Sequence, residues 1–196
     1  MELNCILAGV GGQGTVLASK LIAGAAMEQG YFVRTAETIG MAQRGGSVVS
    51  HVRVGKNIHS PMVPKGSANL IIGFEPGEAV RCLPYLKADG TVIAADKAVR
   101  PVTDSLSSSS YEGESMIAFL REKTSRLILL DTAEIFRETG SSKVLNVALL
   151  GAAAASGALG ISLDDMFSII ERKTPGAYLD SNRTALKIGA KAVATQ

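Results

Sequence analysis

Apolar residues recur along the chain with two different periods. Short apolar runs that end at glycine or polar residues predict buried strands, and they occupy residues 3–8, 31–36, 68–74, 90–96 and 126–131. Between them, apolar positions three and four residues apart predict helices, over residues 15–29, 77–86, 114–123, 132–140, 143–160, 162–173 and 180–194. The helix at 162–173 has the clearest start, because Ser162 and Asp165 form a capping box.

Residues 47–54 follow a third pattern, in which apolar and polar side chains alternate. Three valines and Ser50 share one face, whereas His51 and Arg53 belong to the other. This alternation is typical of an antiparallel strand with one exposed face. A turn at 55–57 then predicts a returning strand from residue 58, and the polar, serine-rich stretch 103–113 predicts a surface loop.

Strands that alternate with helices, with one antiparallel strand inserted, predict the fold class. We expect a Rossmann-like, three-layer α/β/α fold around a mixed, mostly parallel sheet. The length of 196 residues favours one domain that spans residues 1–196.

Composition excludes several classes of partner. The 20 lysines and arginines are scattered and nearly balanced by 18 acids, so we expect no nucleic-acid partner. No apolar run has the roughly 18–20 residues of a membrane span, and the start of the chain lacks a basic segment, so no membrane contact or signal peptide is expected.

The two cysteines, Cys5 and Cys82, are isolated. They predict buried, reduced thiols in a cytoplasmic protein, and no iron–sulfur cluster on this chain alone.

The first strand passes into the first helix through a glycine-rich turn. Glycine allows a tight backbone, and a helix start favours an anion such as phosphate. Three interpretations stay open, namely a turn that only lets the helix pack closely, a site for an anion or nucleotide, and a protein interface. The candidate binding residues in this turn are Gly9, Gly11, Gly12, Gln13 and Gly14.

The spacing Gly9-x-Gly11-x-x-Gly14 also fits the dinucleotide fingerprint. That site needs an acidic residue for the ribose at the end of the second strand, about 20 residues beyond the glycines. Arg34 and Glu37 lie in this zone, so the match is partial. A free-standing NAD(P)-binding oxidoreductase is therefore an alternative function.

A second candidate site follows at Arg44, Gly45 and Gly46. The two glycines let a partner approach the backbone, and arginine prefers planar anions such as carboxylate or phosphate. A solvated arginine on a turn is the alternative. His51 and His59 have no carboxylate or thiol at ligand spacing, so no metal site is expected, and no arrangement of residues suggests a catalytic group on this chain.

The two glycine motifs occur in an order that resembles a known family. The stretches GVGGQGTVLASKLIAGAA, QRGGSVVSHVRVG and IHSPMVPKGSANLIIGFEPGEAVR resemble the gamma-type subunits of 2-oxoacid:ferredoxin oxidoreductases, in particular the small subunit of the indolepyruvate enzymes. The resemblance covers nearly the whole chain and is clearest over residues 3–100, where Ser60-Pro61 follows the second motif.

This resemblance implies an accessory role. Such enzymes oxidatively decarboxylate a 2-oxoacid with thiamine diphosphate, form an acyl-coenzyme A and pass electrons through iron–sulfur clusters to ferredoxin. Thiamine and clusters belong to other subunits, so this chain would bind no cofactor alone. Its expected partners are the thiamine-diphosphate and iron–sulfur subunits, with ferredoxin as acceptor of the complex. A homodimer is one expected form of the isolated chain.

The resemblance also assigns a role to the two glycine motifs. It implies that Gly9 to Gly14 and Arg44 to Gly46 support the phosphates of coenzyme A or the subunit interface. An interaction module without a ligand is the remaining alternative.

Overall fold

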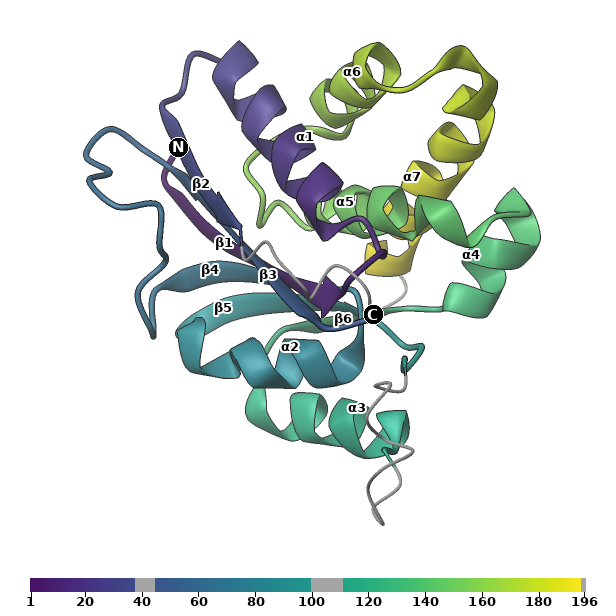
Figure 1. The fold of residues 1–196 in the computed structure, drawn as a ribbon, viewed down its shortest axis with the longest axis horizontal. Coiled ribbons are helices and arrows are strands. Elements are labelled where there is room, and N and C mark those ends of the chain that lie inside the picture. Colours follow the sequence, from purple (N-terminus) through teal and green to yellow (C-terminus); the bar gives the residue numbers. More distant parts are fainter. Residues whose placement is uncertain (38–44, 100–110, 195–196) are drawn as a thin grey trace.

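The computed structural model describes residues 1–37, 45–99 and 111–194. They form a mixed six-stranded sheet in the order β2-β3-β1-β4-β5-β6, with helices on both faces (Figure 1). The predicted three-layer α/β fold is confirmed. The strands are β1 (Leu3–Val10), β2 (Val33–Glu37), β3 (Ser47–Val54), β4 (Ala68–Gly73), β5 (Leu86–Ala95) and β6 (Leu127–Leu130).

Four neighbouring strands run parallel. β1 pairs with β4, β4 with β5, and β5 with β6 in parallel, whereas β3 pairs antiparallel with both β1 and β2. The carboxyl ends of β1, β4, β5 and β6 therefore meet at one edge of the sheet. In open α/β sheets this edge is the usual place of a ligand site.

The helices divide unequally between the two faces (Figure 1). One face is covered by α2 (Pro76–Cys82) and α3 (Gly113–Lys123). The other carries α1 (Thr15–Glu28), α4 (Thr132–Thr139), α5 (Leu145–Ala155), α6 (Leu163–Lys173) and α7 (Leu179–Ala194). Short 3₁₀ turns η2 (Leu83–Tyr85), η4 (Ser142–Val144) and η5 (Gly176–Tyr178) precede or follow helices.

The continuous apolar runs of the sequence are explained by cover on both faces. Along β1, Cys5 and Leu7 belong to the core under α1 and α5, whereas Ile6 and Ala8 belong to the core under α2 and α3. Because successive side chains of a strand point to opposite faces, a strand covered on both sides needs no polar face.

The expectation for residues 47–54 is only partly confirmed. β3 is antiparallel, as predicted, but it is not half-exposed, because it lies between β1 and β2 and buries Ser50 and His51. His51 Nδ1 accepts a hydrogen bond from the Val63 N–H at 3.2 Å. Burial lowers the pKa of His51, which keeps this acceptor nitrogen unprotonated.

The predicted returning strand at residue 58 is wrong. Residues 58–61 form no strand. Instead, Arg53 donates to the Ser60 carbonyl at 2.9 Å and to Asn4 Oδ1 at 2.8 Å, which holds this segment against the end of β3. The loop predicted at 103–113 lies, up to residue 110, outside the described residues.

Small residues let α5 and α7 pack at very short range. A Cβ atom at Gly151 would lie 2.2 Å from the Leu186 carbonyl oxygen, and one at Gly189 would lie 1.8 Å from the Ala148 carbonyl oxygen. The predicted helix over 143–160 is shorter than expected. It starts after η4 and ends at Ala155, since Gly157 takes a left-handed conformation, with φ of 73°.

Candidate functional site

The glycine-rich turn lies at the carboxyl edge of the parallel strands, between β1 and α1. Gly12 and Gly14 have φ of 98° and 88°, a left-handed conformation that glycine adopts at least cost. Gly9 is required for a different reason. A Cβ there would lie 2.8 Å from both Gln13 Oε1 and Phe74 Cβ. The turn is therefore a close-packed structure that positions the start of α1.

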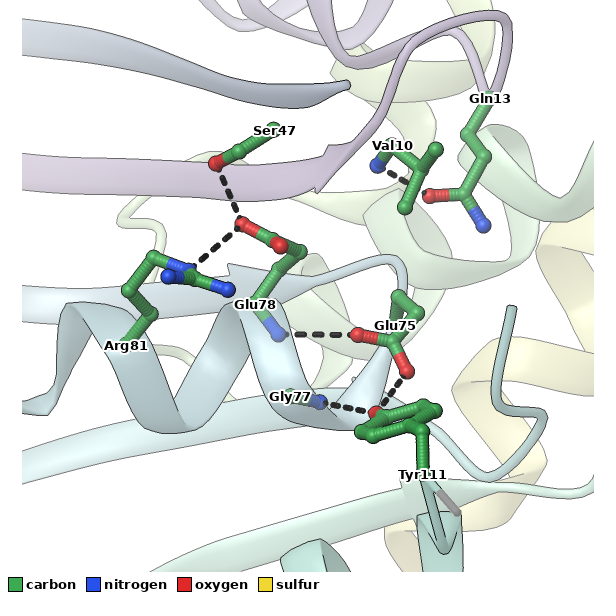
Figure 2. Close-up of polar contacts among 8 residues, drawn as sticks. All are labelled: Val10, Gln13, Ser47, Glu75, Gly77, Glu78, Arg81 and Tyr111. Carbon is green, nitrogen blue, oxygen red and sulfur yellow. Dashed lines mark hydrogen bonds and ion pairs between the residues drawn. The ribbon is translucent and has the colours of Figure 1, made fainter. Parts of the chain in front are cut away.

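Gln13 fastens this turn to the neighbouring strand. Its Oε1 accepts a hydrogen bond from the Val10 N–H at 2.7 Å, and its Nε2 donates to the Phe74 carbonyl at 3.1 Å. In Figure 2 the Gln13 side chain folds back toward Val10, at the end of β1. The side chain thus links the ends of β1 and β4.

The structure brings the two glycine motifs together. The Gly11 N–H donates to the Gly46 carbonyl at 2.9 Å, and Gly45 has a left-handed φ of 81°. Arg44 lies outside the described residues. The described part of the second motif therefore contacts the first through the backbone, and what contacts the Arg44 side chain stays a prediction.

A buried carboxylate cluster lies beside the two motifs (Figure 2). Glu75 is 3% exposed and caps α2 by accepting from the Glu78 N–H at 2.9 Å. Its second oxygen accepts from the Tyr111 hydroxyl, which in turn accepts from the Gly77 N–H at 3.0 Å. Ser47, which directly follows the second motif, donates a hydrogen bond from its Oγ to the Glu78 carboxylate at 2.5 Å. Glu78 also forms a salt bridge with Arg81 at 3.4 Å.

This cluster fixes the edge of the sheet in one arrangement. Burial, followed by the hydrogen bond and negative charge of Glu75, raises the pKa of the Tyr111 phenol, which remains a protonated donor. Sequence reasoning missed the cluster. The signal was present, because Glu75, Pro76 and Glu78 follow the pattern of a capping acid, a first-turn proline and an acid at the third helical position.

A pocket of about 310 Å³ opens at the start of α1. Three of the predicted residues, Gly12, Gln13 and Gly14, line one wall. The rest of the lining comes from residues after β4 and β5, from α4, from the turn η4 and from the start of α5, and it includes Phe74, Lys97, Phe136, Lys143 and Asn146. The two lysines give the pocket a positive charge, as expected of a site for an anion.

The residues expected of a dinucleotide site take structural roles. Glu37 accepts a hydrogen bond from Ser19 Oγ at 2.8 Å, and Arg34 donates to the Ile58 carbonyl at 2.8 Å. β3 also separates β2 from β1. At roughly 4.8 Å per strand, the end of β2 lies about 10 Å from β1, twice the distance in a Rossmann site.

The two cysteines lie on opposite faces of the sheet, since Cys5 belongs to the core under α1 and Cys82 to the core under α2. Burial raises the pKa of Cys5, and burial together with the negative charge of Glu78 raises that of Cys82 to about 12. Both are buried free thiols, as predicted, and they cannot share one cluster.

Two kinds of feature are absent from the described ranges. Among residues 1–37, 45–99 and 111–194, no group of three or more histidine, cysteine or carboxylate side chains is arranged to hold a metal ion. In those same ranges, no helix combines the length and the apolar character that crossing a membrane requires.

Residues 4–192 match the family described as pyruvate ferredoxin/flavodoxin oxidoreductase. Among curated relatives, the indolepyruvate oxidoreductase subunit IorB of Archaeoglobus fulgidus is 37% identical over 190 residues, which is 96% of this chain and 94% of the relative. The IorB subunit of Pyrococcus horikoshii is 35% identical over 193 residues, which is 97% of this chain and 96% of the relative.

Solved structures share the fold. The gamma subunit of a keto/oxoacid ferredoxin oxidoreductase from Geobacter sulfurreducens superposes with a TM-score of 0.71 at 19% identity, over 99% of both chains. The 2-oxoglutarate:ferredoxin oxidoreductase of Magnetococcus marinus matches all of this chain with a TM-score of 0.72 at 17% identity, but only 31% of its own length. The chain therefore belongs to the pyruvate ferredoxin/flavodoxin oxidoreductase family, which includes the gamma-type subunits that its two glycine motifs resemble.

Proposed function

We propose that residues 1–196 form one domain that acts as the accessory subunit of a cytoplasmic 2-oxoacid:ferredoxin oxidoreductase. The complex oxidatively decarboxylates a 2-oxoacid, forms an acyl-coenzyme A and reduces ferredoxin. Family membership over nearly the whole chain carries this proposal. The relatives at 35% and 37% identity are subunits of indolepyruvate oxidoreductases, so indolepyruvate is the first substrate to assay.

The cofactors of the complex are divided between its subunits. Thiamine diphosphate supplies the decarboxylation chemistry and belongs to a partner, as do the iron–sulfur clusters. The two cysteines of this chain are buried on opposite faces of the sheet, which supports this division for the clusters.

This chain contributes to the coenzyme A side of the active site or to the interface beside it. The glycine turn and the segment that follows Arg44 meet through the Gly11–Gly46 hydrogen bond, next to a pocket lined by Lys97 and Lys143. The related 2-oxoglutarate enzyme of Magnetococcus marinus, a larger chain that contains this fold, has been solved with coenzyme A and succinyl-coenzyme A bound. Both observations support a role toward coenzyme A.

We expect the purified chain alone to show no turnover. Assayed with indolepyruvate or pyruvate, coenzyme A, thiamine diphosphate and a viologen dye, it should remain at the background rate. Adding the thiamine-diphosphate and iron–sulfur subunits should restore dye reduction that depends on coenzyme A. Turnover by this chain alone would refute the accessory role.

We also expect no tight binding of NAD(H) or NADP(H). Glu37, the acid at the end of β2, accepts a hydrogen bond from Ser19. β3 lies between β2 and β1, so it separates Glu37 from the glycine turn that follows β1. Calorimetric titration of the chain with each dinucleotide should give no micromolar affinity. A micromolar dissociation constant for either would favour the free-standing oxidoreductase instead.

A further inference from the structure

The two faces of the sheet are covered unequally. Among the described residues, α2 and α3 are the only α-helices on one face, whereas five lie on the other (Figure 1). α3 packs beside α2, and of its 11 residues only Leu120 is buried. A short helix gains most of its stability from a packed apolar face. α3 therefore has little cover in the isolated chain, and a partner that covered it would stabilise it.

A groove of about 670 Å³ opens where α2 and α3 end. It lies at the amino ends of β5 and β6, because its lining includes Leu86, which begins β5, and Lys123, which ends α3 shortly before β6. The glycine turn follows the carboxyl end of β1, and β1, β4, β5 and β6 run parallel. The groove and the candidate site therefore lie at opposite edges of the sheet.

The groove is lined mainly by apolar side chains that the fold leaves partly uncovered. They are Val80, Leu83, Pro84, Leu86, Ala88 and Phe119. Phe119 is 41% exposed, although an aromatic ring contributes a large apolar area when it is covered. Leu83 and Leu86 pack against the core under α2 and α3 but are only partly buried. A contiguous apolar surface of this kind is typical of a contact with another protein.

The charged side chains in the described lining are all positive. Arg81, Lys87 and Lys123 line the groove, and no aspartate or glutamate of the described ranges does. The two lysines pair with acids outside the lining, Lys87 with Asp89 at 3.2 Å and Lys123 with Glu122 at 2.8 Å. Because exposed ion pairs contribute little to stability, a carboxylate of a partner can take the place of these neighbours.

Contacts within the chain account for only part of this pattern. Arg81 and Lys123 lie in the last turns of α2 and α3, where the helix dipole favours positive charge, and Arg81 also pairs with Glu78. Neither effect explains Lys87. Neither explains why the Phe119 ring, 5.6 Å from Lys123 Nζ, lies open at the surface. An apolar groove with a positive rim fits an acidic segment that carries an apolar anchor.

We infer that this groove binds an acidic segment of a partner subunit, which places a bulky apolar side chain against Phe119. The inference rests on the proposed function, because the partner is a subunit of the same complex. The apolar lining favours a permanent subunit contact over a transient encounter. The lysines favour acidic residues beside the anchor. The groove gives the chain a second contact, away from the glycine turn.

The test measures the dissociation constant of the full chain for the thiamine-diphosphate and iron–sulfur subunits, by calorimetry at several salt concentrations. Phe119→Ala removes the exposed ring and should weaken binding about 30-fold. The double variant Lys87→Gln and Lys123→Gln should weaken binding about tenfold and make it less dependent on salt. The melting temperature of each free variant should change little, because these side chains do not belong to the buried core.

Matched controls change the same kinds of residue on the opposite face of the sheet. Met27→Ala removes a side chain of α1 that is 58% exposed. The double variant Lys20→Gln and Lys187→Gln removes two exposed lysines, from α1 and α7. Both controls should bind the partner subunits as the unchanged chain does. Equal losses in the groove variants and the controls would overturn the docking surface.

Hydrogen exchange gives a second measurement, on α3 itself. The backbone amides of α3 should exchange at least about tenfold more slowly in the complex than in the free chain, because the partner covers the helix. Unchanged exchange would overturn the docking surface. Self-association of the free chain that Phe119→Ala abolishes would also overturn it, because a second copy of the chain would then occupy the groove.

Failure of the proposed function gives a different result. If the unchanged chain does not bind the partner subunits, the accessory role is refuted, and the docking surface with it. If the unchanged chain binds and the groove variants bind equally well, the accessory role stands and only the docking surface is refuted.

Discussion

Replacing Gly189 with alanine is expected to destabilise the protein strongly, although it adds only one methyl group. The new Cβ would lie 1.8 Å from the Ala148 carbonyl oxygen, which belongs to the backbone of α5 and cannot rotate away. α5 and α7 must therefore separate along their contact. Overpacking of this kind costs about 3 kcal/mol or more of the free energy of unfolding, which corresponds to a melting temperature lower by roughly 6–12 °C.

The matched control is Gly176→Ala, since no atom lies within 4 Å of the Cβ it would introduce and its φ is not left-handed. Its free energy of unfolding should change by no more than about 0.5 kcal/mol. Thermal and urea denaturation of both variants give the comparison. Equal stability of Gly189→Ala and Gly176→Ala would show that the helices are not in contact as described.

Replacing Arg44 with alanine in the assembled complex is expected to raise the Michaelis constant for coenzyme A about tenfold or more. A guanidinium can make two parallel hydrogen bonds to a phosphate, and loss of a charge-assisted hydrogen bond costs about 1.5–3 kcal/mol. Gly46, two residues along the chain, accepts a hydrogen bond from the Gly11 N–H, and Gly12 to Gly14 of the same glycine turn line the pocket. The Michaelis constant for the 2-oxoacid should change little.

Two further variants make this result specific. Arg44→Lys should recover only part of the loss, because an ammonium cannot form the paired hydrogen bonds of a guanidinium. Arg126→Ala removes an exposed arginine just before β6, at the amino ends of the parallel strands and therefore away from the glycine turn, and should leave the kinetics unchanged. Unchanged coenzyme A kinetics in a normally assembled Arg44→Ala complex would refute the ligand role. Loss of the partner subunits on purification would indicate an interface residue.

Most of the fold could be predicted from the period of the apolar residues. Four strands, β1, β4, β5 and β6, correspond to predicted strands, because burial on both faces leaves a continuous apolar run in the sequence. The seven helices of the described ranges also correspond to predicted elements. The exposure of β3 could not be predicted. Its polar side chains are satisfied inside the fold, as His51 is by the Val63 N–H, and alternation alone cannot reveal such a partner.

The backbone of the candidate site was predictable at the positions where its geometry requires glycine. Gly12, Gly14 and Gly45 all have left-handed φ values, and Gly9 leaves no room for a side chain. The second half of the site was not predictable. Lys97, Lys143 and Asn146 lie far along the chain from the glycine turn and carry no local signature, so the order of the strands is needed to bring them to the turn.

The role proposed for this chain, on the coenzyme A side of a 2-oxoacid:ferredoxin oxidoreductase, is tested most directly by one titration. Coenzyme A is titrated into the complete complex and into the same partner subunits without this chain, and the two dissociation constants are compared. We expect saturable binding to the complete complex and at least a tenfold loss of affinity, about 1.4 kcal/mol, when the chain is omitted. Equal affinity in the two preparations would contradict this role.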